Sequence, residues 1–244
     1  MTVTWEELGW ERLAAGVGRC RLPGWDCTAG LVVGADAVLL VDAGSALAEG
    51  ALLRARAKEL AGRDVTHLAL THPHFDHVFG AAAFPDVEVF GAAGFDAVTG
   101  PAGREELRAD AVRNGLGEGT AGEAADALTP PGHLVRGERT LDLGGRQVLL
   151  ADAGPGHTAH DLAVVVPGDP RVVFCGDLVE ESGEPQAGPD AVPARWPAAL
   201  DRLLALGGAD ALYVPGHGAV VDAVFVRAQR DALAARFGVS RGPS

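Results

Sequence analysis

The chain has 244 residues, 48% of them hydrophobic, and its formal net charge is −13 at pH 7. This length and hydrophobic content suffice to bury one full core, so we expect a single domain over residues 1–244. The acidic charge argues against a nucleic-acid partner, because such binding depends on lysine and arginine side chains at the phosphates.

The sequence also argues against a membrane partner and a secretory route. No stretch approaches the ~18 uninterrupted apolar residues of a membrane span, and no basic and then apolar leader follows Met1. The three cysteines are an odd number without CxxC spacing, which favours reduced thiols over a disulfide framework. We therefore expect a cytoplasmic protein.

The first part of the chain is predicted to be mainly β structure. Residues 1–16 should form an edge strand or an arm folded over the core, and residues 17–42 have the pattern of a β-meander that ends at Asp42. The Asp42 carboxylate could accept the second ring proton of a metal-bound histidine, or it could simply cap a turn or helix. A helix should follow over residues 47–61 and end at Gly62.

Three histidines and one aspartate follow the next predicted strand, residues 65–70. The sequence there is Thr-His-Pro-His-Phe-Asp-His, and Pro73 cannot continue a strand ladder. The cluster should therefore occupy a loop at the carboxyl end of the strand, ahead of a helix near residues 78–84. Imidazole and carboxylate suit zinc, iron or manganese. The candidate ligands are His72 and His74 for one ion and Asp76 and His77 for a second.

Residues 91–137 are predicted to be the least regular part of the chain. A short strand over residues 87–90 precedes them, glycine and proline are then frequent, and only residues 104–113 have a helical pattern. An excursion of this length in a compact domain is usually functional or mobile, so we interpret it as a lid or specificity insertion. His133 within it is either a substrate contact at the mouth of the site or an ordinary loop histidine.

Three further candidate ligands each directly follow an apolar run in the second half of the chain. They are His157, Asp177 and His217. Four strands that end at one edge of the fold would bring these residues to the histidine cluster. His160 could shuttle protons or line the site, or it could belong to a turn that only positions His157.

The end of the chain is predicted to be largely helical. One helix should begin at Trp196, and another should follow an N-cap at Asp222 and run to about residue 237, ahead of a flexible tail over residues 238–244. Strands and helices thus alternate in two halves. This pattern predicts an α/β (α+β) fold, a four-layer αββα sandwich of two mixed sheets with outer helices.

The ordered motifs HxHxDH, GHT, GD and PGHG resemble those of the metallo-β-lactamase-fold hydrolase superfamily. The resemblance extends from about residue 18 to about residue 236 and implies the same αββα fold. It also implies two divalent metal ions, zinc first, with iron or manganese as alternatives. The implied ligands are His72, His74 and His157 for one ion, Asp76, His77 and His217 for the other, and Asp177 as the bridge.

Such a site would use water as its nucleophile. Two ions would make a bridging hydroxide available at neutral pH, and this hydroxide would attack the substrate. Asp76 could also orient the hydroxide and pass a proton to the leaving group. The chain has no GxSxG motif for a serine nucleophile, which supports a metal-activated water.

Departures from the family patterns favour a small ester, thioester or lactone as substrate. True metallo-β-lactamases carry a cysteine or a residue that binds no metal where this chain has Asp177, so the chain is more similar to the glyoxalase II, lactonase and thioesterase branch. Acyl-homoserine lactonases have a tyrosine shortly after that position, where this chain has Glu180 and Glu181. Glyoxalase II enzymes have a longer and more basic C-terminal region.

A mononuclear iron enzyme is the alternative from another class. Persulfide dioxygenases are similar to this chain at each motif but use one iron, which here would be held by His72, His157 and Asp177. A metal-binding protein without catalysis is a third interpretation. For either enzyme the expected partner is a small-molecule substrate, and the sequence leaves a homodimer open.

Overall fold

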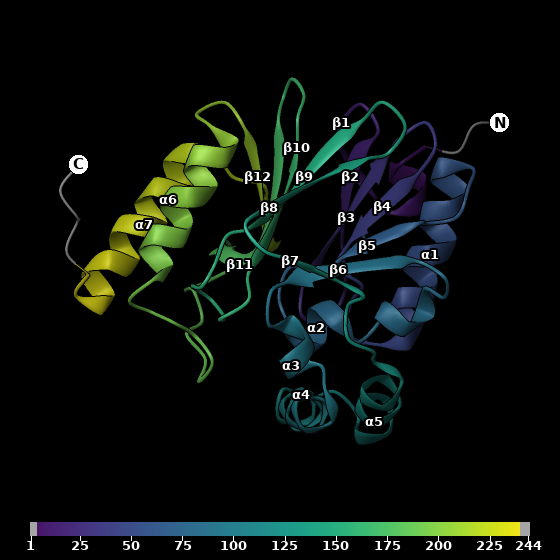
Figure 1. The fold of residues 1–244 in the computed structure, drawn as a ribbon, viewed down its shortest axis with the longest axis horizontal. Coiled ribbons are helices and arrows are strands. Elements are labelled where there is room, and N and C mark those ends of the chain that lie inside the picture. Colours follow the sequence, from purple (N-terminus) through teal and green to yellow (C-terminus); the bar gives the residue numbers. More distant parts are fainter. Residues whose placement is uncertain (1–3, 240–244) are drawn as a thin grey trace.

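Two β-sheets pack face to face in the computed structural model, which describes residues 4–239 (Figure 1). The seven-stranded sheet follows the order of the chain: β1 (Glu11–Ala14), β2 (Val17–Arg21), β3 (Thr28–Val33), β4 (Val38–Val41), β5 (His67–Ala69), β6 (Glu88–Ala92) and β7 (His133–Val135). Strands β1 to β4 are antiparallel to one another, and β4 to β7 are parallel. The five-stranded sheet has the order β12 (Leu212–His217), β11 (Val172–Glu180), β10 (Leu162–Val166), β9 (Gln147–Asp152) and β8 (Glu138–Asp142), with only β11 and β12 parallel.

Helices cover the outer face of each sheet (Figure 1). On the outer side of the first sheet and at its end, which is the lower one in Figure 1, lie α1 (Leu47–Ala61), α2 (Phe75–Val78), α3 (Phe95–Val98), α4 (Pro101–Arg113) and α5 (Glu118–Ala127), with two short 3-10 helices, η1 (Glu6–Leu8) and η2 (Ala81–Ala83). The second sheet is covered by α6 (Trp196–Gly207) and α7 (Ala223–Phe237). The predicted four-layer αββα sandwich of two mixed sheets is confirmed.

Strand alternation divides the core into layers. Strand β4 is buried along its whole length, and its successive side chains point to opposite faces of the sheet. Leu39 and Val41 join the layer between the two sheets, whereas Val38 and Leu40 join the layer between the first sheet and its helices. A further layer lies under α6 and α7, where Trp196 is fully buried. Burial on both faces explains why such strands are apolar without interruption.

The helix after the histidine cluster begins earlier than predicted. Helix α2 starts at Phe75 and not near residue 78, so Asp76 and His77 lie in a helical turn and not on a loop. The prediction was wrong because it extended the break at Pro73 too far along the chain. His74 already has the extended N-cap conformation, and Phe75 is buried in the core.

The segment 91–137 is more regular than predicted. It contains α3, α4, α5 and β7, so the prediction of one helix over residues 104–113 was wrong. Helix α5 is rich in alanine and glycine, and its Ala121, Ala124 and Ala125 are buried in the same core layer as Leu107 of α4. Tertiary packing thus orders a helix that the local sequence did not indicate. A lid or specificity function for this segment stays a prediction.

The two ends of the described chain are held by regular structure. Residues 4–16 contain η1 and β1, the edge strand of the first sheet. Asp222 caps α7 as predicted, because its Oδ1 accepts the backbone N–H of Val224 and of Phe225, both at 2.9 Å. The remainder of the predicted arm and tail, residues 1–3 and 240–244, lies outside the described residues. Within residues 4–239, every helix is too short or too polar to cross a membrane.

Helix α1 passes close to the residues that follow α2, and a substitution at Gly50 tests this contact. A Cβ atom at Gly50 would lie 2.2 Å from the carbonyl oxygen of Gly80. We expect Gly50→Ala to lower the free energy of unfolding in urea by about 1–3 kcal/mol, the usual cost of overpacking. Gly119→Ala in α5 is the matched control, because a Cβ atom there meets nothing within 4 Å, and it should stabilise the protein by about 0.4–1 kcal/mol. Equal stability of the two variants would contradict the close contact.

Candidate metal centre

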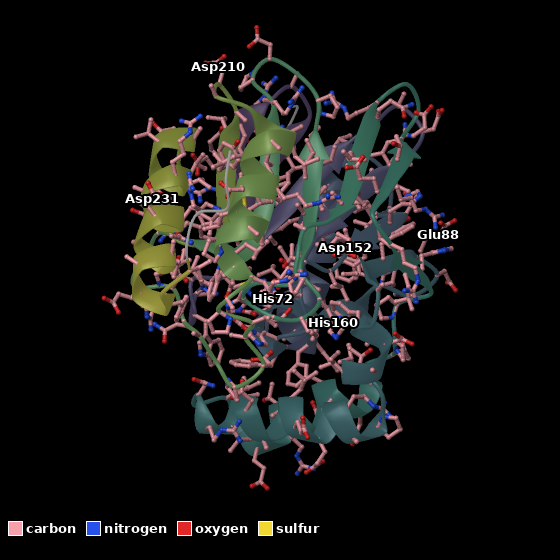
Figure 2. The ribbon with its side chains drawn as sticks, turned by 60° about the vertical axis from the view of Figure 1, so that its left-hand side comes forward. His72, Glu88, Asp152, His160, Asp210 and Asp231 are labelled. Carbon is pink, nitrogen blue, oxygen red and sulfur yellow. The ribbon has the colours of Figure 1, made fainter. Side chains whose placement is uncertain are left out.

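The predicted ligands come together in space. Among them, His72 can be seen at the end of the paired sheets that faces α4 and α5 (Figure 2). They lie after β5 and β9, at the end of β12 and, for Asp177, in the second half of β11. They are His72, His74, Asp76, His77, His157, Asp177 and His217. His74 is the most exposed of them, with 23% of its side chain accessible to solvent.

Four of these side chains form one potential metal site. Ligand atoms of His72, His74, His157 and Asp177 all lie within 4.8 Å of one another. His157 Nε2 is 3.0 Å from His74 Nδ1, and Asp177 Oδ2 is 3.5 Å from His157 Nε2. The same Asp177 oxygen is 3.7 Å from His72 Nε2. Atoms at these separations can converge on one ion, because a zinc–nitrogen bond is about 2.0–2.1 Å long.

Asp177 also belongs to a second group, with His77 and His217. Its Oδ1 is 3.2 Å from His77 Nε2, and its Oδ2 is 3.3 Å from His217 Nε2. Asp76 Oδ2 lies 3.3 Å from the same His217 nitrogen. One carboxylate therefore faces both groups, which is the position that a bridging ligand requires.

Two atoms at the centre of the site have no hydrogen-bond partner among the described residues. They are His72 Nε2 and Asp177 Oδ1, and both are buried. An unsatisfied buried polar atom costs about 1–3 kcal/mol. A divalent ion coordinated by imidazole and carboxylate would satisfy both atoms, so this donor set fits zinc, iron or manganese.

The histidines of the site differ in protonation, and within the first group the Asp190 carboxylate raises the pKa of His74. Burial lowers the pKa of His157 to about 4 and holds the pKa of His72 well below its usual value, so both are neutral at pH 7 and free to bind an ion. Burial acts in the same direction at His217, but Asp177 and Asp76 outweigh it and raise the pKa of His217 to about 12. An ion at the second group must therefore displace a proton from His217.

Each of the five histidines has its other ring nitrogen held by a group outside the site. The partners are Thr71 Oγ1 for His72 (3.0 Å), Asp190 Oδ2 for His74 (2.9 Å), Asp42 Oδ2 for His77 (2.9 Å), the Gln186 carbonyl for His157 (3.1 Å) and the Trp25 carbonyl for His217 (2.7 Å). Carbonyl and carboxylate oxygens can only accept, so the nitrogens that face them carry the proton. The inward nitrogens are then left to bind an ion, as in known metal sites.

Comparison with known proteins identifies the family. The family model described as "Metallo-beta-lactamase superfamily" matches residues 22–217. The chain belongs to this superfamily. A probable metallo-hydrolase of Mycobacterium tuberculosis is 36% identical over 126 residues, which cover 49% of this chain and 39% of that protein. Metallo-beta-lactamase domain-containing protein 1 of Xenopus laevis is 29% identical over 190 residues, which cover 77% of this chain and 69% of that protein.

The match to the mycobacterial protein thus spans about two fifths of that relative's length. Among solved structures, the metallo-beta-lactamase FIM-1 of Pseudomonas aeruginosa, in its mono-zinc form, has a TM-score of 0.70 at 22% identity, with 95% of this chain and 96% of that chain covered. A metallo-beta-lactamase from Pontibacter korlensis has a TM-score of 0.70 at 21% identity, with 92% and 97% covered. At these identities the likeness shows the superfamily fold alone.

Glycines beside the ligands of this superfamily member are required by close packing. A Cβ atom at Gly216 would lie 1.8 Å from Asp177 Oδ1, and one at Gly176 would lie 2.7 Å from Thr71 Oγ1. Gly176 also has a φ of 52°, in the left-handed region that favours glycine. The glycines of the GD and PGHG motifs therefore make room for the ligands next to them.

Sequence analysis indicated one of the ring partners, Asp42, and missed the others. Asp42 has a φ of 59°, which aspartate tolerates better than most residues, and its Oδ1 also accepts the backbone N–H of Thr71 at 2.7 Å. Gln186 and Asp190 lie in the polar loop after β11, where their residue types are ordinary for a surface. Trp25 and Gln186 act through backbone carbonyls, which leave no signal in the sequence.

The remaining predicted site residues make other contacts. His133 Nε2 lies 3.4 Å from Glu88 Oε2, and its ring stacks on Phe90 with centroids 4.7 Å apart. His133 belongs to neither ligand group. His160 Nδ1 donates to the Ala93 carbonyl at 2.8 Å and so links the loop after His157 to the segment after β6. A substrate contact by His133 or His160 stays a prediction.

Arg19 on β2 holds the segment that follows His217. The Arg19 guanidinium is buried and donates to the Gly218 carbonyl and to Glu11 Oε2, both at 2.7 Å. The Gly218 N–H donates in turn to Asp26 Oδ2 at 3.2 Å. Residues of the first half of the chain therefore hold Gly218, the residue after the candidate ligand His217, by hydrogen bonds.

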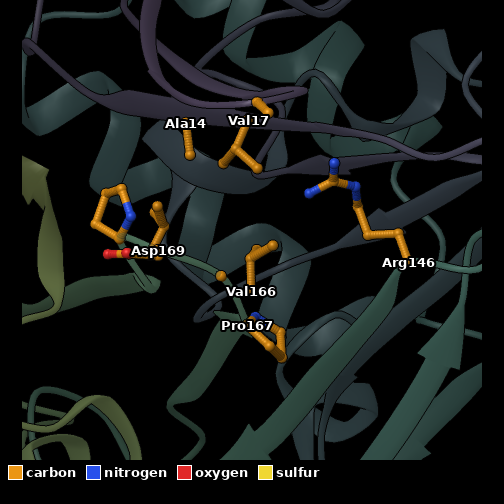
Figure 3. Close-up of a pocket in the computed structure, with 10 residues that line it drawn as sticks. Ala14, Val17, Arg146, Val166, Pro167 and Asp169 are labelled. Atoms are coloured by element: carbon orange, nitrogen blue, oxygen red, sulfur yellow. The ribbon is translucent and has the colours of Figure 1, made fainter.

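A hollow of about 210 Å³ beside Arg146 lies away from this site (Figure 3). Its walls include Val17 and the turn over residues 166–170, which precedes the start of β11. Asp177 lies in the second half of that strand. None of the residues that line the hollow is a candidate ligand.

Asp42→Asn tests the contact that orients His77. The asparagine keeps the shape of the side chain but can present an N–H group to His77 Nδ1, which disfavours the tautomer that frees Nε2. We expect the affinity for zinc at the group that contains His77 to fall about 10–100-fold. Isothermal titration of the chelator-treated protein measures it. Asp64→Asn, at an exposed ion pair with Lys58, is the control and should bind as the wild type does; an unchanged affinity in Asp42→Asn would refute the orienting role.

Arg19→Met should weaken metal binding at the second group more than at the first, because it frees the segment after His217. We expect elemental analysis at limiting zinc to show a loss toward one ion per chain, with a fall in second-ion affinity of about 10-fold or more. Arg19→Lys should restore part of the affinity, since an ammonium can still reach the Gly218 carbonyl. Arg12→Met, on the exposed edge strand β1, is the control. Equal loss of both ions in Arg19→Met would indicate general destabilisation instead.

Proposed function

We propose that the chain is a dinuclear zinc hydrolase that cleaves a small ester, thioester or lactone. The observation that carries this proposal is the position of Asp177, whose carboxylate oxygens lie 3.2–3.7 Å from four histidine nitrogens in two ligand groups. Hydrolysis is supported by the mycobacterial relatives, which are named probable metallo-hydrolases. The superfamily fold positions the candidate ligands but does not identify the substrate.

When bound, two divalent ions supply a water nucleophile at neutral pH and polarise the oxygen of the scissile carbonyl. The protein contributes Asp76 as the group that orients this water. Burial alone would raise the pKa of Asp76, but His77 and His217 hold it below its usual value, so the carboxylate is ionised at neutral pH. It can then accept a hydrogen bond from the attacking water and carry its proton to the leaving oxygen or sulfur.

Asp177 also bears on the choice of substrate. Solved metallo-beta-lactamases share the fold of this chain, but the superfamily resemblance places cysteine or a non-ligand at this position in true β-lactamases. An aspartate that faces both ligand groups therefore favours the ester, thioester and lactone hydrolases over lactam hydrolysis. The substrate is proposed to be a small molecule.

A mononuclear iron dioxygenase is the second candidate, because His72, His157 and Asp177 alone form a set of two histidines and one carboxylate. The complete second group around His77 and His217 favours the dinuclear enzyme over it. Elemental analysis of protein purified without a chelating column separates the two. About two zinc ions per chain support the hydrolase, whereas about one iron per chain, with oxygen uptake on persulfides, supports the dioxygenase.

Asp177→Ala should lose one of the two ions and most of the hydrolytic activity found in a screen of esters, thioesters and lactones. We expect kcat/KM to fall at least about 100-fold, because bound metal ions contribute several kcal/mol of transition-state stabilisation. Asp210→Ala, at an exposed turn before β12, is the control and should keep both ions and full activity. Full activity in Asp177→Ala would exclude the dinuclear mechanism.

A further inference from the structure

Cys27 lies beside the second ligand group. It is the residue before β3, its side chain is buried, and its backbone forms an antiparallel bridge with that of His217. Its Sγ is 3.6 Å from Nδ1 and 3.8 Å from Nε2 of His77. The Cys27 sulfur, a carboxylate oxygen of Asp76 and a ring nitrogen of His77 all lie within 4.8 Å of one another. Neither the proposed hydrolysis nor the seven candidate ligands use this thiol.

The geometry leaves one nitrogen of His77 for an ion. Asp42 holds Nδ1, so Nε2 is the nitrogen that faces the centre of the site. In a tetrahedral zinc site, bonds of about 2.3 Å to sulfur and about 2.0–2.1 Å to nitrogen place the two ligand atoms about 3.5 Å apart. The Sγ–Nε2 distance of 3.8 Å exceeds this by a few tenths of an ångström. The sulfur is almost equally far from both ring nitrogens, so the Cys27 side chain must change its rotamer before the sulfur can bind an ion at Nε2.

An independent observation indicates that an ion belongs beside this thiol. Asp177 Oδ1, which is 3.2 Å from the same His77 Nε2, is buried without a hydrogen-bond partner among the described residues. In the first group, His72 Nε2 is also buried without a hydrogen-bond partner among the described residues. A bound ion or water satisfies oxygen and nitrogen atoms left unpaired in this way, and imidazole beside carboxylate is a donor set that suits a cation.

We propose that Cys27 supplies a thiolate ligand to the ion held by Asp76 and His77, so that this position prefers zinc or cadmium to manganese or magnesium. The inference rests on the proposed metal centre and adds a soft ligand to it. On binding, the Cys27 S–H bond breaks, a sulfur–metal bond forms, and the proton leaves to solvent. Thiolate favours zinc and softer ions, whereas carboxylate and water suit manganese and magnesium.

Cadmium alone is the probe, because a cadmium–thiolate bond gives a charge-transfer absorption band in the ultraviolet. The chain has three cysteines, and Cys20 and Cys175 are buried in other parts of the core. The double variant with Cys20→Ser and Cys175→Ser therefore leaves Cys27 as its sole thiol. In this full-length protein, treated with chelator and titrated with cadmium, we expect the band to appear and to saturate with the bound metal counted by elemental analysis.

Cys27→Ser is the matched single variant and should bind cadmium with loss of the band, while Cys20→Ser and Cys175→Ser should keep it. A band of wild-type intensity in Cys27→Ser, or bound cadmium without a band in the double variant, would overturn the thiolate ligand and leave the dinuclear centre standing. A wild-type protein that binds no cadmium or zinc would overturn the metal centre itself, and this proposal with it. Circular dichroism checks that each variant is folded.

Discussion

The largely buried carboxylate of Asp177, with 12% of the side chain exposed, sets the constraint on which the rest of the structure depends. Removing an ionised carboxylate from water costs several kcal/mol unless opposite charge and hydrogen bonds replace the solvent. Four histidine nitrogens lie within 3.2–3.7 Å of its oxygens. The pairing of β11 with β12 is irregular on both sides of Gly176, and such irregularities turn a side chain away from its regular direction. The regular pairing of β11 with β12 is therefore interrupted next to Asp177, whose side chain faces both ligand groups.

Metal coordination tolerates errors of only a few tenths of an ångström, so the ligands need support from the surrounding fold. The side-chain rings are fixed by the outward contacts to Asp42, Asp190 and three other groups. The backbone is fixed by contacts between the two halves of the chain. The Trp25 carbonyl binds His217, and the Cys27 backbone bridges to His217. The loop before β3, far from any ligand in the sequence, is thus part of the frame of the second group.

The sequence allowed the sandwich and the convergence of the candidate ligands to be predicted, because both follow from patterns that the chain displays locally. Apolar runs ending in histidine or aspartate indicate strand ends, and parallel neighbours such as β11 and β12 bring those ends to one edge. The supporting contacts were not predictable, because a carbonyl at Gln186 or Trp25 can belong to any residue type. Helix α5 escaped prediction for a related reason, since its small residues become a core face only when α4 and the sheet lie against them.

The two ligand groups share Asp177, but their histidines differ in protonation when no ion is bound. Burial keeps His72 and His157 neutral, whereas neighbouring carboxylates keep His217 protonated. Cys27 and the carboxylates of Asp177, Asp76 and Asp42 raise the pKa of His77 well above its usual value despite burial. Protons therefore take the place of a cation at the second group, and they must leave before an ion enters. In the first group, the Asp190 carboxylate raises the pKa of His74. An ion at the first group would therefore displace no proton from His72 or His157, and His74 is the histidine of that group whose raised pKa favours a competing proton. An ion at the first group would neutralise part of the Asp177 charge, and the protons at the second group would then be held less tightly.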